Sequence, residues 1–371
     1  MIKVGVTGSN GFIGWHLCQT IKLYPDIYQL IDFNRSWFDS NSHLDTFVSK
    51  CDIIVHLAGL NRHSDERTIY DTNIGLAKTL VDAFNRTNFK GHLLFSSSTQ
   101  EEKNNVFGNS KKEARTIFSK WAKDNGAKFK GLIIPNVFGP FGVPFYNSVI
   151  ATFSHQLVNN ESPRIETDAT LNLIYINDLV KKIIDIFSSE SIETVNIKFT
   201  DTYKVSQILE LLNKFKSTYL ECCQIPGLKS QFEVNLFNTF RSYLNISTHY
   251  PAKYKNNIDE RGNFVEIIRL ETGGQVSFST TKPGITRGNH FHTRKIERFS
   301  VIKGKALIQL RKIGTNEVFD YHLSGNEPAY VDIPIWYTHN IKNIGEEELY
   351  TMFWINEFYD ANDPDTYFEK V

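Results

Sequence analysis

The sequence predicts an α/β chain in two parts, a doubly wound parallel sheet followed by an all-β barrel. Two observations predict the sheet: apolar strands alternate with helical stretches, and a glycine-rich turn directly follows the first strand. One observation predicts the barrel, because short alternating strands separated by Gly and Pro follow residue 257. At 371 residues the chain is too long for a single compact core. We expect one domain at 1–245, a linker at 246–256 and a second domain at 257–371.

The composition argues against several classes of protein. The 41 acidic and 41 basic residues cancel, so no global field favours nucleic acid or an anionic membrane. No apolar stretch approaches the roughly 18 residues of a membrane-spanning helix, and the N-terminus enters a strand instead of a signal peptide. The four cysteines lack the spacing of a metal knuckle or a redox pair. We therefore expect a cytoplasmic protein with reduced thiols, which binds no nucleic acid and does not insert into a membrane.

A glycine-rich turn links the first strand to the first helix. Glycines at this spacing permit a tight turn, close approach to a pyrophosphate and close packing of helix on strand. The N-terminus of the helix then faces the phosphates. A plain turn-rich loop is the alternative, but the position between a strand and a helix favours a dinucleotide. The residues expected at the cofactor are Gly8, Asn10, Gly11, Phe12, Ile13 and Gly14.

Two charged residues after the second strand point to different cofactors. Asp32 lies where a carboxylate could accept hydrogen bonds from an adenosine ribose, as in NAD-binding proteins. Arg35 could instead meet the 2′-phosphate of NADPH, and otherwise it is a solvated loop charge. We favour NADPH and keep NAD as the alternative. The strand residues His56 and His92 are expected to be structural.

Residues 1–245 resemble the extended short-chain dehydrogenase/reductase family, also called the NAD-dependent epimerase/dehydratase family, which has a Rossmann-like sheet. The shared segments are the TGxxGxxG loop, His56-Leu57-Ala58-Gly59, Phe95-Ser96-Ser97-Ser98, Pro135-Asn136-Val137-Phe138-Gly139-Pro140 and Ile174-Tyr175-Ile176-Asn177-Asp178-Leu179-Val180. The resemblance implies that Ser98 polarises a sugar carbonyl and that Lys111 holds the nicotinamide ribose. It also implies that Leu57 and Ala58 lie beside the cofactor and that Asn136 contacts the substrate.

The chain departs from this family at the catalytic tyrosine, because Phe107 stands at that position. Phenylalanine keeps the ring but has no hydroxyl to protonate the oxygen that becomes an alkoxide during hydride transfer. Loss of a general acid typically costs about 10²–10⁴ in rate. We therefore expect cofactor binding together with impaired reduction.

The second part of the chain carries a metal-binding pattern. Two His at i and i+2 on a strand point to the same face, and a Glu and a third His from neighbouring strands would complete the set. Three nitrogens and one oxygen suit Zn²⁺, with Fe²⁺ or Mn²⁺ as alternatives. The expected ligands are His290, His292, Glu297 and His339. Their spacing from Gly284, Gly304, Pro334 and Asn343 is that of the two cupin signatures, with Trp336 where a glycine is usual.

The start of this barrel, residues 259–266, resembles the deoxysugar epimerases related to dTDP-4-keto-6-deoxyglucose 3,5-epimerase. The resemblance implies that Arg261 pairs with a nucleotide diphosphate, the alternative being a surface arginine. The segment Thr286-Arg287-Gly288-Asn289-His290 resembles one in which the histidine is the proton-abstracting base. His290 thus has three interpretations, as a metal ligand, as an epimerase base or as a core residue, and we favour the ligand.

Both parts together resemble the CapF/FnlB-type bifunctional UDP-sugar enzymes of capsule and O-antigen synthesis over nearly the whole chain. The resemblance implies C3-epimerisation of a UDP-linked 4-keto-2-acetamido-2,6-dideoxy-L-hexose by the cupin and NADPH-dependent C4 reduction by the Rossmann-like domain. The product would be UDP-2-acetamido-2,6-dideoxy-L-talose, and the protein a homodimer. The alternatives are a non-catalytic sugar-nucleotide-binding scaffold and a metal-dependent cupin isomerase with a structural Rossmann domain.

Overall fold

The computed structural model of the chain describes residues 1–189, 191–260 and 262–371. These residues form two compact units. The first consists of Met1–Val149 and Thr167–Val205, and the second of Ile150–Glu166 and Ser206–Val371. No helix within the described residues is long and apolar enough to cross a membrane.

The first unit is built on a six-stranded sheet in which every neighbouring pair is parallel. Its order is β2-β1-β3-β4-β5-β8, so the direction of winding reverses between β1 and β3. The strands are β1 (Ile2–Thr7), β2 (Tyr28–Ile31), β3 (Ile53–His56), β4 (His92–Ser98), β5 (Lys128–Ile134) and β8 (Glu193–Asn196). A smaller sheet beside it consists of β6 (Asn136–Phe138), β7 (Thr170–Tyr175) and β9 (Asp201–Lys204). The prediction of a doubly wound sheet is confirmed.

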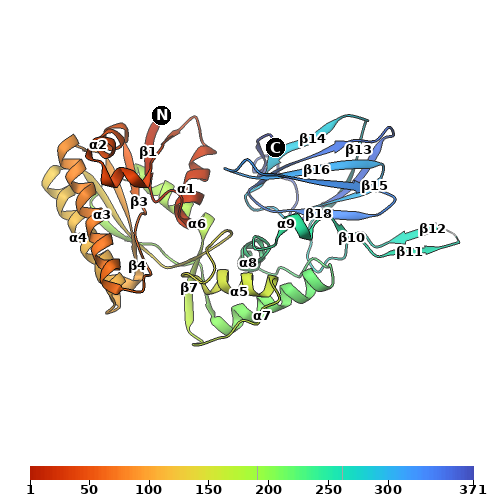
Figure 1. The fold of residues 1–371 in the computed structure, drawn as a ribbon, viewed down its shortest axis with the longest axis horizontal. Coiled ribbons are helices and arrows are strands. Elements are labelled where there is room, and N and C mark those ends of the chain that lie inside the picture. The colour runs from red at the N-terminus through yellow and green to blue at the C-terminus, as the bar shows by residue number, and fades with distance from the viewer. Residues whose placement is uncertain (190, 261) are drawn as a thin grey trace. The chain divides into compact units, whose positions relative to one another are not determined.

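Helices cover both faces of the six-stranded sheet (Figure 1). They are α1 (Phe12–Lys22), α2 (Asn41–Lys50), α3 (Glu66–Thr87), α4 (Val106–Asn125) and α6 (Ile176–Asp185), with short 3₁₀ turns η1 (Arg35–Asp39), η2 (Thr99–Glu102) and η3 (Ile186–Ser188). Helices α2, α3 and α4 pack side by side on one face, and α1 packs against α6 on the other. The central strands are therefore apolar on both sides, and Leu93 and Leu94, which point to opposite faces, are both fully buried.

The second unit contains two five-stranded antiparallel sheets. One has the order β10-β18-β15-β20-β13 and the other β17-β16-β19-β14-β21. Their strands are β10 (Ala252–Lys253), β13 (Gln275–Thr281), β14 (Thr286–Phe291), β15 (Glu297–Lys303), β16 (Lys305–Lys312), β17 (Val318–Ser324), β18 (Ala329–Ile333), β19 (Tyr337–Asn343), β20 (Leu349–Ile355) and β21 (Tyr367–Phe368). A separate hairpin, β11 (Asn256–Asp259) with β12 (Gly262–Val265), projects from them (Figure 1). The prediction of an all-β C-terminal fold is confirmed.

Helical segments join this unit as well, and they account for a difference from the expected organisation. They are α5 (Val149–Val158), α7 (Val205–Phe215), the π-helical η4 (Lys216–Glu221), α8 (Gln231–Arg241) and α9 (Ile246–His249). Residues 206–245 were expected with the parallel sheet, and 246–256 as a linker. In the structure α9 and β10 lie inside the supposed linker, and its Ile246 and Tyr250 are buried in the core of the second unit. The division of the chain into functional domains at 1–245 and 257–371 stays a prediction.

A buried polar network explains why these helical segments pack on the sheets. Arg298 on β15 donates two hydrogen bonds to Asp332 on β18, at 2.6 and 2.9 Å. The hydroxyl of Tyr219 in η4 donates to the same carboxylate at 2.6 Å. Arg241 at the end of α8 donates to the carbonyl of Ile333 at 3.0 Å. Because a buried charge needs such partners, the Arg298–Asp332 pair ties η4 to the strands, whereas Nε and Nη1 of Arg241 make no hydrogen bond among the described residues.

Candidate functional site

The glycine loop lies where the winding of the parallel sheet reverses, which is where such sheets bind nucleotides. A Cβ added to Gly8, whose φ is +76°, would lie 2.7 Å from the backbone nitrogen of Ala58. A Cβ on Gly14 would lie 2.1 Å from the carbonyl oxygen of Gly8. The loop therefore packs against Leu57-Ala58 after β3 and against its own helix, so neither glycine can carry a side chain.

The N-terminus of α1 is open to an anion. Its N-cap is Gly11, which has no side chain to accept hydrogen bonds from the first turn. The residues of that turn, Phe12 to Trp15, carry no acidic group. The N–H groups of this first turn and the positive end of the helix dipole can therefore hold a phosphate. This geometry supports a pyrophosphate at the predicted residues.

Lys111 is held in place on α4 beside the sheet. Its Nζ donates to the carbonyl of Ser96 at 2.8 Å and lies 5.8 Å from the centroid of the Phe107 ring. The side chain is buried, and burial lowers the pKa of Lys111 to about 8, opposed by the charge of Glu101. The lysine and the phenylalanine at the tyrosine position therefore lie together, as the spacing predicts.

The remaining predicted residues of this unit follow the carboxyl ends of its strands. Ser98 ends β4, and its hydroxyl accepts from the backbone N–H of Gln100 at 3.2 Å. Asn136 begins β6, and its amide donates to the carbonyl of Asn172 at 3.2 Å. Asp32 and Arg35 follow β2, and both are exposed. Carboxyl ends of parallel strands share one edge, so these groups surround the same edge as the glycine loop.

His56 and His92 have partners that suit structural roles. The Nδ1 of His56 is paired with the hydroxyl of Thr7 at 2.7 Å, and burial, then the charge of Lys111, lowers the pKa of His56 to about 3. The Nδ1 of His92 is 3.3 Å from the carbonyl oxygen of Phe187, and burial lowers the pKa of His92 to about 4. Both imidazoles are therefore neutral at physiological pH.

The four predicted metal ligands of the second unit converge. His290 is on β14, His292 directly follows that strand, and His339 on β19 pairs with His290 across the ladder. Glu297 comes from β15 in the other sheet. One donor atom from each residue lies within 4.8 Å of the other three, and only His290 is half exposed. The four side chains therefore meet, as their spacing predicts, and their role as metal ligands stays a prediction.

The charges of this His/Glu cluster are mutually dependent. The Nε2 atoms of His292 and His339 lie 3.2 and 3.3 Å from Glu297 Oε2. Burial opposes ionisation of the carboxyl, but the two imidazoles outweigh it and hold the pKa of Glu297 well below its usual range. Burial likewise opposes protonation of His292, but Glu297 and the Asp365 carbonyl outweigh it and raise the pKa of His292. Burial, then the charges of His339 and His292, lowers the pKa of His290 to about 4.

These donors fit a divalent metal ion. The Nε2 of His339 is buried and, among the described residues, makes no aligned hydrogen bond despite its approach to Glu297. An orphaned ring nitrogen facing a carboxylate and two further imidazoles is what a coordinated ion would satisfy. Three nitrogens and one oxygen suit Zn²⁺, Fe²⁺ or Mn²⁺.

Comparison with known proteins agrees with this geometry. Residues 4–197 match the model of the NAD dependent epimerase/dehydratase family, and residues 257–367 match the polysaccharide biosynthesis C-terminal domain. A protein of Pseudomonas aeruginosa strain PA103, UDP-2-acetamido-2,6-beta-L-arabino-hexul-4-ose reductase, is 33% identical over 371 residues, 99% of this chain and 98% of that protein. The chain belongs to the NAD-dependent epimerase/dehydratase family.

One solved structure matches the chain over its whole length, and another matches the first domain. The capsular polysaccharide assembling protein CapF from Staphylococcus aureus is 34% identical, with a TM-score of 0.63 and full coverage of both chains. The full-length similarity to CapF confirms the predicted resemblance. RMD from Pseudomonas aeruginosa, solved with NADPH, is 20% identical over 58% of this chain and 83% of that one, with a TM-score of 0.53. That likeness shows the fold of the epimerase/dehydratase domain alone.

Two residues that hold the sites in shape were not foreseen from the sequence. In the epimerase/dehydratase domain, the buried Asn73 of α3 accepts from Leu60 N–H at 2.7 Å and donates to Ser110 Oγ at 2.9 Å. Beside the cluster, Asp365 accepts hydrogen bonds from the turn that follows His292. Both are polar residues in ordinary sequence surroundings, and only their distant partners identify them. Arg261, predicted to bind a diphosphate, lies outside the described residues.

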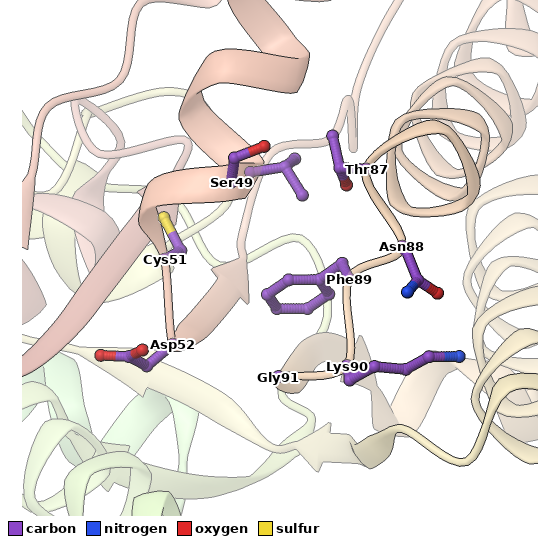
Figure 2. A pocket seen from close by; sticks show the side chains of 9 residues that line it. Ser49, Cys51, Asp52, Thr87, Asn88, Phe89, Lys90 and Gly91 are labelled. Atoms are coloured by element: carbon purple, nitrogen blue, oxygen red, sulfur yellow. The ribbon is translucent and has the colours of Figure 1, made fainter.

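A hollow of about 360 Å³ lies on the first unit, the epimerase/dehydratase domain (Figure 2). It is lined by Val48, Ser49, Cys51, Asp52, Thr87, Asn88, Phe89, Lys90 and Gly91. Asp52 and Gly91 precede β3 and β4, so the hollow lies at the amino ends of the strands, opposite the glycine loop. Its thiol is inert, because burial, reinforced by the charge of Asp52, raises the pKa of Cys51 to about 12. We assign no function to it.

Proposed function

We propose that the protein modifies a UDP-linked 4-keto-2-acetamido-2,6-dideoxy-L-hexose in capsule or O-antigen synthesis. The His/Glu cluster epimerises C3, and the nucleotide site then reduces C4 with NADPH, towards UDP-2-acetamido-2,6-dideoxy-L-talose. The observation that carries this function is the presence in one chain of an open phosphate loop with Lys111 and a buried His/Glu cluster. The substrate class comes from the full-length relative, whose name is that of a reductase of such a sugar. A nucleotide substrate and unpaired cysteines suit a cytoplasmic reaction.

The chemistry of the first step suits the cluster. The C3 hydrogen lies α to the C4 ketone, so a base can remove it if charge on the ketone oxygen is stabilised. A divalent ion bound here would supply that stabilisation. His290 is the half-exposed member and has a lowered pKa, so its neutral imidazole can serve either as a ligand or as the base.

The second step depends on the nucleotide site. NADPH would supply the hydride, and the turn after β2 favours it over NADH. The Asn34 side chain accepts from the N–H of Ser36 at 3.0 Å and from its hydroxyl at 2.9 Å, so the turn carries Arg35 as an exposed cation. An arginine in this place suits a 2′-phosphate. Phe107 supplies no proton to the C4 oxygen, so we propose that reduction is slow relative to epimerisation.

The decisive experiment is NMR of the product formed from the 4-keto sugar in D₂O. We expect deuterium at C3 without NADPH, loss of this exchange after chelation, and the C4 alcohol only when NADPH is present. Absence of exchange at C3 would exclude the epimerase. Exchange without any reduction would leave an epimerase with a nucleotide-binding domain. Phe107 is consistent with this narrower function, because it has no hydroxyl to protonate the C4 oxygen. A protein that binds the sugar nucleotide without either change would be a scaffold.

The affinity for NADPH is expected to fall as the pH rises through about 8. The pKa of Lys111 lies there because of burial, so the ammonium that would bind the nicotinamide ribose is lost above this pH. Fluorescence titration of NADPH between about pH 7 and about pH 9 measures the effect. The variant Lys111→Met should bind weakly and show no inflection near pH 8. An inflection that persists in this variant would contradict the assignment.

We also propose that the protein is a homodimer formed through the second unit. An isolated two-stranded hairpin is only marginally stable in water. The hairpin of β11 and β12 also exposes two large apolar side chains, Ile258 at 71% and Phe264 at 70%. Strand β13 forms an edge of its sheet and exposes Phe278 at 75%. A hairpin added to the β13 edge of a second copy would cover all three side chains.

The double substitution Phe264→Ser with Phe278→Ser is expected to convert the dimer into a monomer. It removes apolar area from both sides of the proposed contact, and light scattering after gel filtration measures the mass. Phe199→Ser is the matched control, because Phe199 is exposed at 49% and belongs to the first unit and not to the hairpin or β13. A wild-type monomer, or a double variant that stays dimeric, would rule out this interface.

A further inference from the structure

Residues 363–371, the strap segment, pack along β14, the strand that carries His290 and that His292 directly follows. Within the segment, β21 pairs with β14, with Tyr367 opposite Phe291 and Phe368 opposite His290. The rings of Phe291 and Tyr367 stack with centroids 5.3 Å apart. Figure 1 shows the end marked C beside β14. The strap segment therefore lies directly against the strand of the cluster.

Asp365 is the buried centre of the strap segment, with 2% of its surface exposed. Its Oδ1 accepts from the N–H and the hydroxyl of Thr293, at 3.0 and 2.7 Å. Its Oδ2 accepts from the N–H groups of Arg294 and Lys295, at 3.0 and 3.1 Å. These three residues form the turn between His292 and Glu297, so one carboxylate fixes the connection between two cluster side chains.

The main chain of Asp365 makes a second contact with the cluster. Its carbonyl oxygen lies 2.5 Å from the Nδ1 of His292. A carbonyl can only accept, so Nδ1 carries a proton, and Nε2, which faces the Glu297 carboxylate at 3.2 Å, is the nitrogen that would give up its proton to bind an ion. The residue has φ of +41°, a left-handed conformation that Asp and Asn tolerate better than other side chains. The backbone at 365 is thereby held where its carbonyl reaches the imidazole.

We propose that Asp365 is a positioning residue of the metal centre, selecting the Nδ1–H tautomer of His292 and holding the 293–295 turn so that Nε2 and Glu297 face one ion. This inference rests on the proposed metal site and adds to it the group that orients one ligand. Carbonyl or carboxylate partners of a ligating imidazole fix its tautomer and ring orientation, and their loss typically costs about 10–100-fold in metal affinity.

The test is the substitution Asp365→Asn, measured by competition titration with Zn²⁺ and by the visible absorption of Co²⁺ bound to the full-length protein. Asparagine keeps the size and the left-handed conformation but turns one oxygen into an amide donor that faces the N–H donors of the turn. We expect Zn²⁺ affinity to fall about 10–100-fold and the Co²⁺ spectrum to shift. Asp363→Asn is the matched control, because this carboxylate is 69% exposed and contacts Arg294 without touching the turn's N–H groups.

The outcomes separate the inference from the proposed function. Wild-type protein that binds neither ion would overturn the metal centre and the role of Asp365 with it. Wild-type binding that Asp365→Asn leaves unchanged, in affinity and in Co²⁺ spectrum, would overturn the role of Asp365 alone. If Asp365→Asn does not fold, judged by circular dichroism, Thr293→Val takes its place, since it removes a single hydrogen bond to the same carboxylate. An unchanged affinity in that variant would count equally against the role.

Discussion

Replacing Phe107 with tyrosine is expected to increase the rate of NADPH-dependent reduction about 10²–10⁴-fold, the usual contribution of a positioned general acid. The place for the hydroxyl already exists. Phe107 is in the first turn of α4, after the N-cap Asn105 whose side chain accepts from Gly108 N–H at 2.8 Å. Lys111 follows one turn later, with Nζ 5.8 Å from the Phe107 ring centroid. A tyrosine at 107 would bring its hydroxyl beside a lysine that is already buried and oriented.

The measurement is the loss of NADPH absorbance with the 4-keto sugar as substrate, together with C3 exchange in D₂O. Exchange at C3 should not change, because it belongs to the cluster of the other unit, so it serves as an internal control. The double variant Phe107→Tyr with Lys111→Met should lose most of the gain, whereas Phe107→Leu should resemble the wild type. Equal reduction rates for the wild type and Phe107→Tyr would show that water or another side chain already supplies the proton.

Local patterns with fixed spacing could be predicted from the sequence. The glycine loop, the end of β4 at Ser98 and the α4 position of Lys111 depend on neighbours a few residues away. The cluster could be foreseen too, because alternation along a strand puts His290 and His292 on one face and the cupin spacing adds the other two ligands. A repeat of two residues brings His290 and His292 together, whereas Glu297 and His339 lie on other strands and could be foreseen only from the cupin spacing.

Features that depend on distant partners could not be predicted. Helix α3 begins at Glu66, where Asp65 caps a polar first turn that has no apolar periodicity to mark it in the sequence. The segment 246–256 appears as a linker because its apolar anchors are few and widely spaced. Asp365 acts on residues about seventy positions earlier, and nothing beside it in the sequence marks those partners.

Glu297→Gln is expected to abolish metal binding and to slow deuterium exchange at C3 about 10²–10³-fold, the usual cost of losing one electrostatic stabiliser of developing charge. The amide keeps the size of the side chain, so the 6% exposed position stays filled. What disappears is the charge that both His292 and His339 approach within 3.3 Å. A neutral amide is a poor ligand for a divalent ion, and it leaves two buried imidazoles without their anion.

Metal content by mass spectrometry and C3 exchange by NMR together decide what the cluster does. Glu327→Gln is the matched control, because that carboxylate is 74% exposed and pairs only with Lys253 at the surface among the described residues. NADPH binding should be the same in both variants, which separates loss of the metal centre from general unfolding. If Glu297→Gln loses the metal but exchanges C3 at the wild-type rate, the ion is structural and the base acts alone.

The variant His290→Asn distinguishes the two roles of His290. Retained metal with lost C3 exchange would make His290 the base, and loss of both would make it a ligand.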